Sequence, residues 1–165
     1  SKNLWFDGVR KRMSHIKKVS DDTAFHREEF PFYWIVNVYA RYTQTVEVAL
    51  KKIALDVSRF RVLMITHQYG EASISQISEY ALAKMPTVTK IVGRLREDGL
   101  VTTANSASDA RVTVVMLTEA GQQKVAEAMP LVGKIFDKGF KGMSVSQVEK
   151  MNQSLSKVLD NLNEL

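Results

Sequence analysis

Residues 86–99 read PTVTKIVGRLREDG, and their apolar side chains follow a helical period. The apolar positions, three and four residues apart, are Val88, Ile91, Val92 and Leu95. This spacing places them on one face of an amphipathic helix. Pro86 suits the first helical position, where a missing N–H does no harm, and Gly99 suits the end. The sequence therefore predicts a helix over 86–98 with one buried stripe.

A second short helix precedes this one. Ser73 and Gln76 have the spacing of a capping box, in which each side chain bonds the other residue's backbone N–H. The apolar residues Ile74, Ile77 and Ala81 follow, and then a turn over 82–85. Two short helices joined by such a turn form a candidate helix-turn-helix, whose second helix enters the DNA major groove.

The face of 86–98 opposite its apolar stripe is polar and small, as a groove-bound helix requires. Arginine can pair bidentately with guanine, threonine can contact several bases, and lysine more often binds phosphate. With two serines at the start of the preceding helix, the candidate DNA contacts on the two helices are Ser73, Ser75, Thr87, Thr89, Lys90 and Arg94. A helix-turn-helix pattern alone is weak evidence, because many helical hairpins share it.

After Gly99 the pattern changes to two β-branched segments, 100–103 and 112–116, separated by a small, polar loop at 103–109. A hairpin directly after the second helix is typical of a winged helix. Arg111 is placed to reach a minor groove, where the negative potential favours arginine, and Asp109 can hold it. The alternative is an ordinary surface salt bridge.

The flanking segments are also helical. We predict a helix of about 20 residues from Pro31 to near Asp56, then one over 57–70 with Phe60, Leu63 and Met64 inward. Thr118 should cap a later helix that Pro130 kinks or interrupts. A capping box at Ser144 and Gln147 starts the last helix. We expect that helix to bury Val148, Met151, Leu155, Val158, Leu159 and Leu162.

Composition excludes several classes of protein. The chain has 165 residues and no cysteine, which rules out disulfides, thiolate metal sites and cysteine nucleophiles. Its apolar runs are too short to span a bilayer, and no secretory signal is visible, so we expect a cytoplasmic protein. The three histidines are scattered, and no catalytic motif is present. We therefore expect neither an enzyme nor a metal or cofactor site.

The net charge of +5 resides at the N-terminus. Residues 1–18 hold six basic residues and one acidic residue, while the remaining 147 residues hold 17 of each sign. Residues 3–19 have the spacing of an amphipathic helix. Such a basic arm suits nucleic acid, an anionic membrane surface or an acidic partner, and a solvated helix face is an equal alternative.

Residues 84–121 resemble the MarR family of bacterial transcriptional regulators. The matching pieces are TVTKIV at 87–92, RLREDGLV at 94–101, DAR at 109–111 and LTEAG at 117–121. The resemblance implies a mainly α fold with a small β-hairpin wing: a winged helix-turn-helix lobe at 57–121, dimerisation helices at 31–56 and 122–165, and a separate basic arm at 1–30. The apolar character of the terminal helices independently favours a homodimer over a monomeric helical core.

The resemblance also implies a function: a repressor on a pseudo-palindromic operator, released when a small aromatic acid or its thioester binds. The effector-binding candidates, aromatic walls and cations for a carboxylate, are Tyr39, Arg41, Tyr42, Phe60 and His67. Equally, the aromatics can be core residues and Arg41 a solvated charge. The thiol-oxidation switch found in part of the family is excluded, because the chain lacks cysteine.

Two positions depart from the family pattern. Ala110 and Thr103 stand where the family often has basic residues, which lowers the charge of the wing. We hypothesise that the basic arm compensates by contacting the DNA backbone, so that deletion of residues 1–19 lowers affinity and its salt dependence. Two other functions remain open: a winged-helix protein-interaction module and a peripheral membrane protein that binds through its arm.

Overall fold

The computed structural model describes residues 27–165, so the expected helix over 3–19 lies outside the described residues. The chain divides into two units, residues 1–41 and 42–165. In the first unit, the short 3-10 helix η1 (Arg27–Glu29) precedes the start of α2 (Pro31–Lys51). The Trp34 indole N–H donates to the carbonyl of Glu28 at 2.8 Å, which ties η1 to α2.

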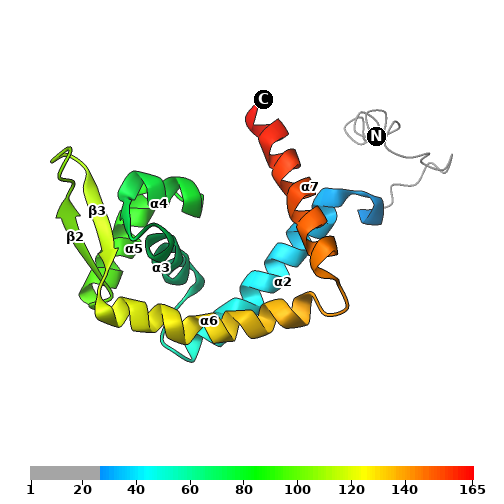
Figure 1. Cartoon of the computed structure of the whole chain (residues 1–165), viewed down its shortest axis with the longest axis horizontal. Helices are drawn as coiled ribbons and strands as arrows, with labels where there is room; N and C mark the ends of the chain where they lie inside the picture. The colour runs from blue at the N-terminus through cyan, green and yellow to red at the C-terminus, as the bar shows by residue number, and fades with distance from the viewer. Residues whose placement is uncertain (1–26) are drawn as a thin grey trace, which may run out of the picture. The chain divides into compact units, whose positions relative to one another are not determined.

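The second unit begins within α2 and contains a compact lobe (Figure 1). Its elements are, in order, α3 (Val57–Tyr69), β1 (Glu71–Ser73), α4 (Ile74–Ala81), α5 (Met85–Glu97), β2 (Val101–Asn105) and β3 (Thr113–Leu117). Two further helices follow, α6 (Glu119–Gly139) and α7 (Val145–Asn163). The predicted helical order is confirmed for residues 31–165. Among the described residues, no helix combines the length and apolar character needed to cross a bilayer.

The lobe's sheet has three strands where the sequence predicted a two-stranded hairpin. Strand β3 lies in the centre and pairs antiparallel with β2 on one side and β1 on the other. The sequence did not predict β1 because three residues are too short to show an alternating pattern. The loop was also placed too early, since β2 continues to Asn105, opposite Thr113. Small polar residues form the end of this strand rather than a turn.

The lobe's core is built from the predicted apolar stripes. Leu63 of α3, Ile77 of α4, Leu95 of α5 and Val115 of β3 are all fully buried. They belong to one cluster with Val46 and Leu50 from the last turns of α2. This packing fixes which face of α5 points outward, because its Val88–Val92–Leu95 stripe is turned into the lobe.

Three predicted helix features differ from the structure. The first long helix ends at Lys51, not near Asp56, because Ala54 adopts a left-handed conformation (φ 57°) in the turn that follows. α5 begins at Met85, so Pro86 is its second residue. α6 continues through Pro130 to Gly139, so the predicted interruption is wrong. A proline in a helix removes one hydrogen bond, and the other bonds of the 21-residue α6 keep it continuous.

The last helix starts as predicted but does not bury its apolar side chains within the chain. Ser144 and Gln147 form both bonds of the capping box, at 3.2 and 2.8 Å. No residue of α7 is buried, and Leu155, Val158, Leu159 and Leu162 are 40–58% exposed. The expectation of burial is therefore wrong for the single chain, and α7 presents an apolar face to its surroundings.

Candidate nucleic-acid interface

The helix-turn-helix is formed by α4 and α5, and hydrogen bonds fix both its helix start and its turn. The Ser73 hydroxyl accepts from the Gln76 N–H at 3.1 Å, and the Gln76 side chain accepts from the Ser73 N–H at 2.9 Å. The predicted capping box is thereby confirmed. Ser73 is partly buried in this role, whereas Ser75 is exposed at the start of α4. Leu82 closes the helix in a left-handed conformation with φ 52° and ψ 41°.

Helix α5 presents a polar face outward. Its apolar residues Val88, Val92 and Leu95 are at most 4% exposed. The predicted contact residues Thr87, Thr89, Lys90 and Arg94 are all exposed. The Thr89 hydroxyl donates to the Met85 carbonyl at 2.9 Å, which holds its side chain along the first turn. The structure thus places four of the predicted DNA-contact residues on the exposed part of one helix.

The wing carries the remaining two predicted contacts, and they form an ion pair. The Arg111 guanidinium donates to both carboxylate oxygens of Asp109 at 3.1 Å, and its backbone N–H donates to the same group at 3.0 Å. The side-chain bond and then the backbone bond from Arg111 lower the pKa of Asp109. The Arg111 side chain is 90% exposed, so it is aimed by Asp109 but not covered.

The base of the wing is anchored to the helices on either side of it. The Thr118 hydroxyl donates to the Gly99 carbonyl at 2.6 Å and accepts from the Gly121 N–H at 3.0 Å. Gly99 has φ 72°, a conformation that favours glycine. Through Thr118, the end of α5 and the start of α6 share one hydrogen-bond chain. The sequence predicted the cap by Thr118 but not its bond to Gly99.

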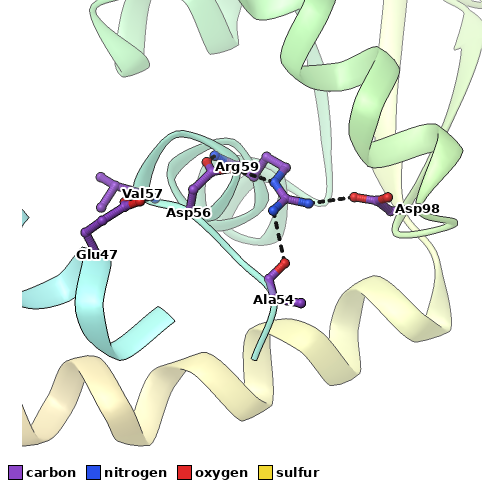
Figure 2. A network of polar contacts seen from close by, with 6 residues as sticks. All are labelled: Glu47, Ala54, Asp56, Val57, Arg59 and Asp98. Atoms are coloured by element: carbon purple, nitrogen blue, oxygen red, sulfur yellow. Dashed lines mark hydrogen bonds and ion pairs between the residues drawn. The ribbon is translucent and has the colours of Figure 1, made fainter. Parts of the chain in front are cut away.

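A polar network that the sequence did not predict surrounds Arg59 near the start of α3 (Figure 2). Its guanidinium donates to Asp56 at 2.7 Å, to Asp98 at 2.7 Å and to the Ala54 carbonyl at 3.0 Å. Burial opposes ionisation of Asp56, but the backbone and side-chain hydrogen bonds from Arg59 outweigh it and lower its pKa. Glu47 of α2 accepts from the Val57 N–H at 3.0 Å beside this cluster. In the sequence, only Asp56, a residue type favoured at helix starts, indicated any part of this network.

The effector-binding candidates lie in different surroundings. Tyr39 and Arg41 lie on the part of α2 in the first unit, and both are exposed. Tyr42 and His67 are exposed in the second unit. Phe60 is 9% exposed and belongs to the lobe's core, which favours the alternative of a packing residue at that position. Among residues 27–165, no three histidine or acidic side chains converge to hold a metal ion.

Comparison with known proteins agrees with this geometry. A family model described as the MarR family matches residues 55–113, which span the lobe from the α2–α3 junction to the wing. The HTH-type transcriptional repressor IacR of Pseudomonas putida is 49% identical over 157 residues, covering 95% of this chain and 93% of that protein. The chain belongs to the MarR family. It is a transcriptional regulator of the helix-turn-helix type.

Solved structures of other MarR-type regulators share the fold. CouR from Rhodococcus jostii RHA1, bound to p-coumaroyl-CoA, aligns with a TM-score of 0.76 at 20% identity, over 82% of this chain and 95% of that one. A point mutant of MarR from E. coli, in complex with operator DNA, aligns with a TM-score of 0.71 at 19% identity, over 83% and 99%. The predicted winged-helix fold is therefore confirmed.

Proposed function

We propose that this MarR-family chain acts in the cytoplasm as a homodimeric repressor, which binds a pseudo-palindromic operator and leaves it when a small aromatic ligand binds. The observation that carries this proposal is the division of α5 into a buried apolar stripe and an uncovered Thr/Lys/Arg face. A helix of this kind followed by a wing is suited to insert between the two DNA backbones.

The proposed roles of the DNA contacts follow from their chemistry. Arg94 has a planar fork that pairs with the O6 and N7 atoms of guanine, so we assign it direct base recognition. Lys90 lies one turn earlier and suits a phosphate. Thr87, Thr89 and Ser75 supply hydroxyl groups near the helix starts. Arg111, aimed by Asp109, suits a narrow minor groove.

A second copy of the chain is the proposed cover for α7. Its face of exposed leucine and valine side chains is of the kind that obligate protein interfaces bury. A two-fold axis would present two α5 helices to half-sites one DNA turn apart, which is the geometry of a pseudo-palindrome. The homodimer is also what the family resemblance implies.

The proposed effector is an aromatic acid or its coenzyme A thioester. CouR, a structural neighbour, was crystallised with p-coumaroyl-CoA, a ligand of this class. Tyr39, Arg41, Tyr42 and His67 remain the proposed contacts. The ligand must bind the DNA-incompatible arrangement more tightly than the DNA-compatible one, since a ligand without such a preference shifts nothing.

The test begins with an operator chosen by the protein itself. The full chain selects binding sites from a random duplex library, and fluorescence anisotropy then measures its affinity for the selected site. Arg94→Ala should weaken operator binding roughly 5- to 150-fold and relax the choice at one base pair in each half-site. Arg96→Ala is the matched control, because it removes the same charge from a different face of α5. Equal losses for both variants would contradict base recognition by Arg94.

The effector class is tested separately. Thermal unfolding of the full chain with a panel of aromatic acids and their thioesters should show a raised midpoint for a binder, by mass action. The same compound should displace the selected operator. If the compounds that stabilise the protein do not displace the operator, the proposed release is contradicted.

A further inference from the structure

The loop between α2 and α3, residues 52–56, is held by cations from two different helices. The carbonyl of Ile53 accepts from the Lys124 ammonium of α6 at 3.0 Å. The next carbonyl, of Ala54, accepts from Arg59 of α3 at 3.0 Å. Ala54 has a positive φ, so the backbone departs from right-handed helical geometry at this residue. Two adjacent carbonyls of the loop are thus each held by a cation from a different helix.

Arg59 extends this anchor to the recognition helix. A second arm of its guanidinium donates to the Asp98 carboxylate, which is 39 residues away in sequence (Figure 2). Asp98 caps the C-terminal end of α5, and its N–H donates to the carbonyl of Arg94 at 2.9 Å. The carboxylate that Arg59 holds therefore lies on the same turn of backbone that carries Arg94.

The Arg59–Asp98 contact is more important for the orientation of α5 than for folding stability. The Arg59 side chain is 21% exposed and that of Asp98 is 45% exposed, and an ion pair open to water contributes little to folding stability. Apolar packing of the α5 stripe is strong but non-directional. A charged hydrogen bond with a planar guanidinium constrains angle as well as distance, so it fixes how the end of α5 is tilted in the lobe.

We propose that Arg59 is a positioning residue for operator recognition: through Asp98 it holds the C-terminal turn of α5, and hence Arg94, at a fixed place relative to the α2–α3 loop. The inference rests on the proposed function of α5 as the DNA-reading helix. Arg59 touches no DNA in this role. Its effect is on specific binding, because only base recognition depends on the angle at which α5 enters the groove.

The decisive variant is Asp98→Ala, because position and charge predict opposite results. Removing an acidic group from a DNA-binding lobe should strengthen binding to any duplex, if charge alone matters. Release of α5 should instead weaken binding to the selected operator roughly 3- to 30-fold while leaving random-sequence affinity unchanged or higher. The matched control is Glu97→Ala, which removes the same charge from the neighbouring exposed residue. It should not lower the operator-to-random affinity ratio.

Variants of Arg59 complete a double-mutant cycle. Arg59→Gln should lower the ratio as Asp98→Ala does, and the double variant should be no worse than Arg59→Gln alone. Arg59→Lys keeps the charge but has no planar fork to reach three acceptors, so it should not restore the ratio. Thermal unfolding of each variant separates loss of folded protein from loss of recognition.

The outcomes are distinct. A lower ratio for Asp98→Ala with a wild-type midpoint supports the inference. If the operator-to-random affinity ratio is unchanged for both Asp98→Ala and Arg59→Gln, even with a lower unfolding midpoint, the network only supports the fold and the inference is overturned. A wild-type chain that selects no duplex at all overturns the proposed function and the inference together.

Discussion

Helices α5 and α7 are both amphipathic, but they place their apolar faces in opposite surroundings. α5 buries Val88, Val92 and Leu95 in its own lobe and leaves threonine, lysine and arginine outside. α7 has no buried residue and leaves leucine and valine outside. The same helical period therefore produces one helix whose apolar face is buried within the chain and one whose apolar face is exposed. The exposed chemistry shows what each helix still lacks: a polyanion for α5 and an apolar partner for α7.

The largest expected effect comes from disrupting the apolar face of α7. Replacing Leu155 and Leu159 with lysine puts two charges on the apolar face, one turn apart, which a protein interface cannot bury. We expect the double variant to be a monomer by light scattering and to bind the selected operator at least about 100-fold more weakly, because one half-site replaces two.

The control for this variant adds the same charge to the other side of α7. Gln153→Lys combined with Asp160→Asn also raises the net charge by two, and both positions lie away from the leucine face. This protein should remain a dimer with operator affinity near wild type. A monomeric control, or a dimeric leucine variant, would remove the argument that α7 is completed by a second copy.

The contrast between the two helices also explains how far the sequence could be interpreted. Period and helix-start residues predicted where α7 begins, where α5 begins to within one residue, and which side of each helix is apolar, because these signals are local. They could not say which apolar side stays inside the chain, since burial depends on partners distant in sequence. The expectation that Leu155 and Leu159 are buried was wrong for the single chain for this reason.

The candidate site shows the same limit. Thr87, Lys90 and Arg94 could be predicted as exposed because they lie opposite a stripe that the lobe's own elements cover. The Arg59–Asp98 bond could not, because it joins residues 39 apart and neither position departs from the pattern of a polar surface. Strand β1 is a similar case, since its three residues become a strand only through pairing with β3.

Two glycines of α6 test the packing at the boundary of the lobe, because a methyl group would meet the Leu100 backbone at one and open space at the other. A methyl group at Gly121 would lie 2.0 Å from the Leu100 carbonyl oxygen, a backbone atom that cannot turn away. We expect Gly121→Ala to lower the free energy of unfolding by about 3 kcal/mol and to loosen the wing. Gly133 has nothing within 4 Å of the same position, so Gly133→Ala should instead stabilise the helix by about 0.5–1 kcal/mol.

Chemical denaturation of the two variants measures both effects. The prediction depends on the sign difference between two identical substitutions in one helix. Similar destabilisation by both would mean that Gly121 is not a packing constraint of the lobe, and that the base of the wing is less tightly fixed than its hydrogen bonds indicate.

The smallest expected effect concerns the turn of the helix-turn-helix. Leu82 holds a left-handed conformation that suits glycine, and the residue is 92% exposed, so it gains little from burial. Leu82→Gly should raise the free energy of unfolding by roughly 0.5–1 kcal/mol, since relief of the backbone strain exceeds the added freedom of the unfolded chain. Leu82→Ala keeps the strain and should give no gain. If alanine stabilises as much as glycine, the exposed side chain and not the backbone is the unfavourable feature, and the lobe containing α5 carries no strain at its turn.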